Sequence, residues 1–150
     1  MVIIGPGASS LSISGVSNTQ GGAIVSDGNL AIFSSTLSNN SASIGGGAIF
    51  AESGNLVITG ATFTSNSMTA STSSPPAEGG AIQSWVQATI DASTFTGNTV
   101  TQNATNGSAY GGAAAEDRTT AAGLTIMNSQ FYSNSTCSPQ GYASAGAIED

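Results

Sequence analysis

Two short motifs recur four times along the chain, always in the same order. The first is a glycine pair followed by Ala, and it reads GGAI or GGAA. The second is an apolar residue followed three places later by Asn, as in "TFTSN" and "TFTGN". Successive glycine pairs begin roughly 25 to 33 residues apart, a period typical of solenoids, in which each unit buries its inner face by stacking on its neighbours. Their positions are 21–22, 46–47, 79–80 and 111–112.

A third element, Leu-x-Ile or Ala-x-Ile, lies between the two motifs. Apolar and polar residues alternate in it with a period of two, which indicates a β-strand. Each unit therefore predicts short strands, and stacked units pair them in parallel. We expect an all-β chain that folds as a right-handed parallel β-helix of about four to five coils, with three short strands in each. A β-sandwich fits less well, because it needs hairpin turns between antiparallel strands.

The repeats span residues 21–148, and residues 1–20 are expected to form a first coil or cap. We interpret residues 1–150 as a single β-helix domain, a segment of a larger surface protein. The final "GAIED" begins a fifth unit that does not finish. Because the end of a solenoid presents open strand edges, we expect end-to-end self-association as one mode of partnership.

The repeated residues are expected to be structural. An Asn in a coil corner can bond backbone groups, and stacked Asn side chains can form a ladder. The apolar residues of the second motif should point inward, where burial stabilises each by roughly 1.5–3 kcal/mol. The glycine pairs allow a tight corner or a close approach of the backbone. The ladder candidates are Asn40, Asn66, Asn98 and Asn134, and the inward column is Leu37, Phe63, Phe95 and Phe131.

Three longer segments follow the Asn motif, at 65–78, 98–110 and 133–145. Their sequences differ from one another and are rich in Ser, Thr and Asn, whereas the first Asn turn is short. We expect them to protrude from one edge of the solenoid. Variable loops at one corner are where solenoids commonly place specificity.

Charge excludes several functions. The chain has eight acidic residues, one Arg, no Lys and no His, for a net charge of −7. Phosphate recognition needs clustered basic residues, so nucleic acid and anionic membranes are excluded as partners. Zinc is excluded because there is one Cys and no His, and we expect no cofactor. No apolar run approaches the ~18 residues of a membrane span, so we expect no direct membrane insertion.

One cluster could carry chemistry. Glu116, Asp117 and Arg118 form either a small acid–base or Ca²⁺ site, or a solvated turn with a weak ion pair. A sugar-cleaving enzyme needs paired carboxylates or a strong base, and with one basic residue we expect no catalytic and no metal-binding residue. Cys137 is either an incidental free thiol or a crosslink to a partner. Asn39, Asn103, Asn106 and Asn134 begin N-x-S/T sequons.

The paired "GGAI" and "F-x-x-N" elements resemble the polymorphic outer membrane protein repeat. The opening "GPGASSLSISG" also resembles the first coil of secreted pectin-lyase-like β-helix adhesins. The resemblance covers residues 5–148, and two positions depart from it: Leu37 replaces Phe, and "GGAA" replaces "GGAI" once. It implies a surface or secreted passenger domain that adheres or displays loops, and it does not imply catalysis.

Two functions of different classes follow. The first is a non-enzymatic extracellular or cell-surface module for adhesion, display or structural spacing, with a host or neighbouring cell-surface component as partner and an export signal that is not in this chain. The second is ice binding through outward Thr residues that flank the inward column. A polysaccharide-acting enzyme is a third, weaker reading. The outward array is Thr36, Ser38, Thr62, Thr64, Thr94 and Thr96, followed by the bulkier Gln130 and Tyr132.

Overall fold

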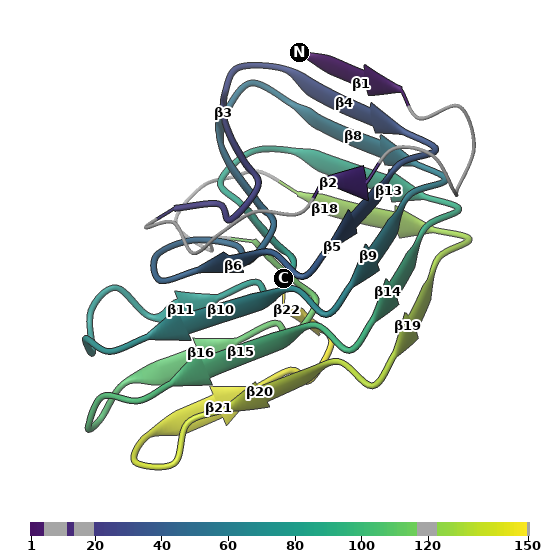
Figure 1. Cartoon of the computed structure of the whole chain (residues 1–150). Helices are drawn as coiled ribbons and strands as arrows, with labels where there is room; N and C mark the ends of the chain where they lie inside the picture. Colours follow the sequence, from purple (N-terminus) through teal and green to yellow (C-terminus); the bar gives the residue numbers. More distant parts are fainter. Residues whose placement is uncertain (5–11, 14–19, 117–122, 150) are drawn as a thin grey trace.

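The computed structural model describes residues 1–4, 12–13, 20–116 and 123–149, and within this part of the chain every regular element is a β-strand. The strands stack in parallel as a β-solenoid of about 4 turns (Figure 1). The predicted all-β parallel helix is therefore confirmed. Each turn adds one strand to each of several sheets, so strands that pair in space lie one coil apart in sequence.

Three sheets form the body of the solenoid. The LxI sheet contains β1 (Val2–Ile4), β4 (Leu30–Phe33), β8 (Leu56–Thr59), β13 (Ala88–Asp91) and β18 (Leu124–Met127). The Thr sheet contains β2 (Ser12–Ile13), β5 (Thr36–Ser38), β9 (Thr62–Thr64), β14 (Thr94–Thr96) and β19 (Gln130–Tyr132). The GGA sheet contains β3 (Ile24–Asp27), β7 (Ile49–Ser53), β12 (Ile82–Ser84), β17 (Ala114–Glu116) and β22 (Ile148–Glu149).

Two further sheets build a lateral projection, which we call the arm. One contains β6 (Ser41–Ala42), β10 (Ser67–Ala70), β15 (Thr99–Gln102) and β20 (Ser135–Cys137); the other contains β11 (Ala77–Glu78), β16 (Ser108–Tyr110) and β21 (Tyr142–Ser144). Figure 1 shows these strands extending together to one side of the body. The expectation of three strands per coil is wrong, because a complete coil has five. The segments after the Asn motif each fold into two strands.

The arm has a small core of its own, which explains why low-complexity segments become ordered there. Met68, Ala70, Ala77, Val100 and Ala109 are buried together between its two sheets. Met68, Ala70 and Val100 alternate with Ser and Thr, so the sequence there looks like that of a polar loop. The protruding segments are therefore stacked in register from coil to coil, and they do not behave as independent variable loops.

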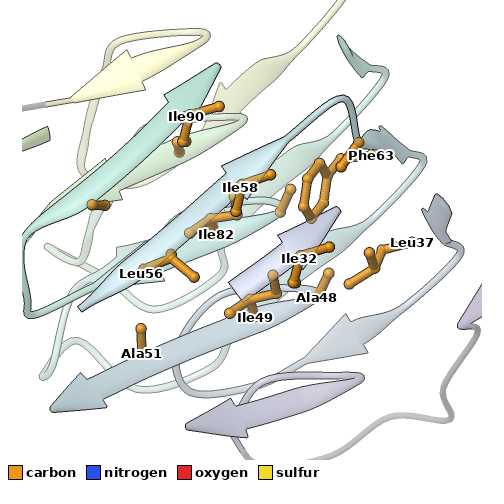
Figure 2. Close-up of a cluster of buried hydrophobic side chains, with 14 of the residues drawn as sticks. Ile32, Leu37, Ala48, Ile49, Ala51, Leu56, Ile58, Phe63, Ile82 and Ile90 are labelled. Carbon is orange, nitrogen blue, oxygen red and sulfur yellow. The ribbon is translucent and has the colours of Figure 1, made fainter. Parts of the chain in front are cut away.

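Register in the body matches identical positions of the repeat. Leu56 pairs with Ala88 and Ile58 with Ile90, and the side chains between them point outward. Figure 2 shows the inward side chains gathered in the interior of the coils. Alternation of apolar and polar residues thus places one face of every strand in a single continuous core.

The inward column of the Thr sheet is an aromatic stack. Phe63 and Phe95 have ring centroids 4.7 Å apart and planes inclined by 3°, and Phe131 continues the stack at 4.8 Å. Leu37 pairs with Phe63 and occupies the same column. The separation equals the spacing of paired strands, about 4.8 Å. Coil stacking therefore dictates the ring geometry.

The two glycines of a pair have different structural roles. The first takes a left-handed backbone conformation at Gly21, Gly79 and Gly111, with φ of +66° at Gly79, whereas Gly46 does not. The second is a point of close contact between coils: a Cβ on Gly80 would lie 2.0 Å from the carbonyl oxygen of Gly112. Ala145 stands where the fifth unit should have its first glycine, and its φ is +52°.

We expect Ala145→Gly to raise the free energy of unfolding by about 0.5–1 kcal/mol. A residue with a Cβ costs roughly 1–2 kcal/mol in the left-handed region, and glycine's extra freedom in the unfolded chain returns part of that gain. Urea denaturation followed by the fluorescence of Trp85 measures the change. A loss of stability would show that the Ala145 methyl group makes packing contacts worth more than its backbone strain.

Candidate functional site

The four asparagines of the repeat form a side-chain ladder along the solenoid. The Nδ2 of Asn40 donates to the Oδ1 of Asn66 at 2.8 Å. The same bond recurs from Asn66 to Asn98 and from Asn98 to Asn134, each at 2.9 Å. All donors point toward the next coil, so the ladder has one direction.

The side-chain amides of Asn66, Asn98 and Asn134 also bind the backbone of the coil before them. The Nδ2 of Asn98 donates to the carbonyl oxygen of Phe63 at 3.1 Å, and its Oδ1 accepts the backbone N–H of Asn66 at 3.0 Å. Asn40, Asn66 and Asn98 are all fully buried. These side chains are occupied in holding coils together, and they are not available to a ligand.

A second ladder, made of serine hydroxyls, escaped the sequence analysis. It lies at the corner between the LxI and Thr sheets. The Oγ of Ser93 accepts the backbone N–H of Ala61 at 3.1 Å, and the Oγ of Ser129 accepts that of Ser93 at 3.1 Å. The sequence did contain a signal for it. A Ser stands directly before the first outward residue of the Thr sheet in three of the four repeats, and Ala61 stands there in the other.

The serine ladder is interrupted at Ala61, where the repeat has no hydroxyl group. Because Ala61 has no hydroxyl, it cannot accept the backbone N–H of Ser35, which stands one coil above it. We expect Ala61→Ser to stabilise the protein by about 1 kcal/mol, the usual net worth of a hydrogen bond. Thermal unfolding by calorimetry measures the effect. A lower melting temperature would mean that the buried site has no room for the oxygen.

The outward Thr residues form ranks across neighbouring coils. Thr94 pairs with Thr62, which pairs with Thr36, and Thr96 pairs with Thr64, which pairs with Ser38. Each of these side chains is partly exposed. The structure thus places together the six residues that the sequence singled out. The fourth strand of the rank carries Gln130 and Tyr132, whose side chains bond each other at 2.9 Å.

The first arm sheet carries a second set of hydroxyl ranks, which sequence reasoning missed. Its outward residues pair in the same way, Thr101 with Thr69 and with Cys137. The other outward rank is Ser41, Ser67, Thr99 and Ser135. We call the outward side chains of the Thr sheet and of this arm sheet together the hydroxyl face.

Charge is segregated away from the hydroxyl face. None of the strands of its two sheets contains a charged residue. The carboxylates among the described residues lie on or beside the LxI sheet, the GGA sheet and the second arm sheet: Asp27, Glu52, Glu78, Asp91, Glu116 and Glu149. A partner of the hydroxyl face therefore meets mainly hydroxyl and methyl groups, together with Gln130, Tyr132 and Cys137, and no charged side chain on the strands that the structure describes there.

The acid–base cluster proposed from the sequence is only partly visible. Glu116 ends β17 and is buried, whereas Asp117 and Arg118 lie outside the described residues. In the ranges that the structure describes, no three His, Cys, Asp or Glu side chains gather in a way that could hold a metal ion. Cys137 is a free, exposed thiol on β20.

The sequon asparagines fall into two classes. Asn39, Asn103 and Asn106 are exposed, whereas Asn134 is part of the ladder and is partly buried.

A pocket of about 330 Å³ lies beside β1 and is lined by residues such as Val2, Leu30 and Val57. Its lining also includes Met1, whose terminal ammonium group donates to the carbonyl oxygen of Asn29 at 2.6 Å, and it contains no carboxylate.

Comparison with known proteins gives one match. Residues 34–52 match the family model described as the Chlamydia polymorphic membrane protein (Chlamydia_PMP) repeat. The matched segment contains Leu37, Asn40 and the second glycine pair. No curated protein matches the chain, and neither does any solved structure. In the described part of the chain, no helix is long and apolar enough to span a membrane.

The match and the fold agree with each other. The family match at residues 34–52 and the β-solenoid fit a polymorphic outer membrane protein repeat, so the resemblance inferred from the sequence is confirmed. The family and the fold are compatible with a surface module of the adhesin type and with a location at the cell surface.

Proposed function

We propose that this chain is a non-enzymatic β-helix module that acts in adhesion or display at the cell surface or outside the cell. The observation that carries the proposal is the match of residues 34–52 to a membrane-protein repeat. In this chain the repeated Asn and Phe residues bond and pack between coils, so their role is structural. The motif residues that hold the coils together point inward, whereas the side chains between them face outward, where a partner can reach them. On this proposal, the outward faces of the β-solenoid carry the binding function.

The hydroxyl face is the surface that we assign to adhesion. It is built on paired strands, so its side chains are held in ranks about 4.8 Å apart. Rigid presentation lowers the entropy lost on binding. Because its strands carry no charge, attachment through it should change little with ionic strength, unlike attachment through exposed carboxylates. The partner on this proposal is an uncharged component of a host or neighbouring cell surface.

We expect the double variant Thr64→Tyr/Thr96→Tyr to reduce binding of protein-coated beads to cells at least tenfold. Two adjacent bulky rings interrupt the ranks and hold a flat partner away from them, and a tenfold loss corresponds to about 1.4 kcal/mol. Retention of beads under flow, counted at low and at high salt, measures the effect.

The control is Thr89→Tyr, which places one Tyr on the outward side of the LxI sheet. It should leave attachment unchanged, and circular dichroism should show that all variants fold. Equal loss in the control and the double variant would remove the hydroxyl face from the proposal. Absence of attachment by the parent protein would contradict adhesion itself.

Ice binding is the second candidate, favoured by the register of the Thr ranks. Thr36, Thr62 and Thr94 pair directly across three coils, so hydroxyl and methyl groups repeat at strand spacing. A lattice of ordered water is a partner that such a repeat fits. Thermal hysteresis in the parent, abolished by Thr64→Tyr/Thr96→Tyr and retained in Thr89→Tyr, would support ice binding. Lack of hysteresis in the parent would eliminate it.

A further inference from the structure

The structure separates the four sequons by whether the amide nitrogen of their Asn can react. Asn103 and Asn106 lie in the connection between β15 and β16, at the end of the arm away from the body (Figure 1). Their side chains are exposed and make no hydrogen bond to any part of the chain that the structure describes. Asn39 is likewise exposed, at the corner before β6.

Asn134 differs in both respects. Its Oδ1 accepts from Asn98 at 2.9 Å, and its Nδ2 donates to the carbonyl oxygen of Phe95 at 3.0 Å. A sugar on this nitrogen would have to lie inside the corner of the coil, where the backbone of Phe95 approaches it. The ladder position and a glycan therefore exclude each other.

The rest of the ladder avoids the sequon altogether, for a structural reason. The residue two places after each ladder Asn points into the arm, where it packs as a core side chain. It is Ala42, Met68 or Val100 in the first three units, and none of these is Ser or Thr. In the fourth unit that place is taken by Thr136. The sequon at Asn134 thus arises from an inward Thr.

We propose that the exposed sequons at Asn103 and Asn106 on the arm, together with Asn39, are acceptor sites for N-linked glycans, and that Asn134 is not. This inference rests on the extracellular location in the proposed function, because the donor is a lipid-linked diphosphate oligosaccharide of the export pathway. The Asn Nδ2 forms a bond to the anomeric carbon of the sugar and loses one proton. The bond from that carbon to the diphosphate breaks, and the lipid diphosphate leaves with its electron pair.

The local backbone suits the tip of the arm for this role. The N–H of Asn103 donates to Ala70 and that of Asn106 to Gln140, each at 2.9 Å, so the main chain is anchored while both side chains point into solvent. The hydroxyl of Thr105, which completes the first sequon, bonds only the exposed Gln140 at 2.7 Å. A glycan can therefore be accommodated without breaking a buried contact.

The test is secretion of the full chain from a eukaryotic cell line, followed by intact mass and site-by-site peptide mass before and after enzymatic release of N-glycans. We expect glycan on Asn103, Asn106 or Asn39, and none on Asn134, in the folded secreted protein. The triple variant Asn39→Gln/Asn103→Gln/Asn106→Gln should lose every glycoform and keep its circular dichroism spectrum.

Two outcomes would overturn the inference: secreted, folded protein with all three exposed sites unmodified, or folded protein with glycan on Asn134. Neither outcome bears on adhesion, because the bead assay uses protein made without glycans. Conversely, failure of attachment in that assay would leave the assignment of acceptor sites intact.

Discussion

Replacing Asn98 with Leu should lower the free energy of unfolding by about 3–6 kcal/mol. The change removes two donated and two accepted side-chain hydrogen bonds, and it leaves the backbone N–H and one side-chain N–H of Asn66 buried without the acceptor that Asn98 supplies. Each buried polar group left unsatisfied costs roughly 1–3 kcal/mol, which is why the loss exceeds that of an ordinary hydrogen bond. Urea denaturation monitored through Trp85 is the measurement.

Asn55→Leu is the matched control for this prediction. Asn55 is exposed, and its recorded contact to Asn29 is made by its backbone N–H, so the same substitution should change stability by no more than about 0.5 kcal/mol. If the two variants were equally stable, the asparagine ladder would contribute little to the free energy of folding. The register of the coils would then be held by other contacts between them.

Gly80→Ala is the second change with a large expected effect, a destabilisation of about 4–5 kcal/mol. The added Cβ would meet the carbonyl oxygen of Gly112 at 2.0 Å and the backbone nitrogen of Thr99 at 2.7 Å. Backbone atoms on both sides cannot give way as a flexible side chain can, so the two coils must separate. Overpacking of this kind lies at the upper end of single-residue effects.

Gly97→Ala distinguishes crowding from backbone conformation. Gly97 has φ of +63°, and the nearest atom to an added Cβ is the Ser65 hydroxyl at 3.9 Å. This variant should cost only the roughly 1–2 kcal/mol of a left-handed alanine. Calorimetric melting temperatures of the two variants should therefore differ widely. Similar melting temperatures would show that the coils can spread at Gly80 at little cost.

The register of the body could be predicted from the sequence. Equal spacing between the Ile of the LxI element and the next apolar residue implied one register for all coils, and Leu56, Ala88 and Leu124 do pair in line. The same spacing implied that Phe63, Phe95 and Phe131 would stack, as they do. Periodicity is a local property of the chain, so it survives into the fold unchanged.

The arm was not readable in this way. Residues 65–78 look like a flexible loop by composition, yet Met68, Ala70 and Ala77 are buried. Their burial needs the corresponding residues of the next coil, Val100 and Ala109, which lie about 32 residues away in sequence. The serine ladder was missed for a related reason, since a hydroxyl reveals its partner only when the neighbouring coil is in place.

The sequence by itself determined that the chain would be a parallel solenoid and which residues of the LxI and Thr sheets would face inward, because the repeat fixes both the period and the stacking. It also identified the Thr residues of one face. Only the tertiary structure decided how the uncharged surface continues onto the arm, and which sequon amides are free and which is locked in the ladder. Those properties depend on contacts between coils, and a linear pattern of residues does not specify the distance from one coil's side chain to the next.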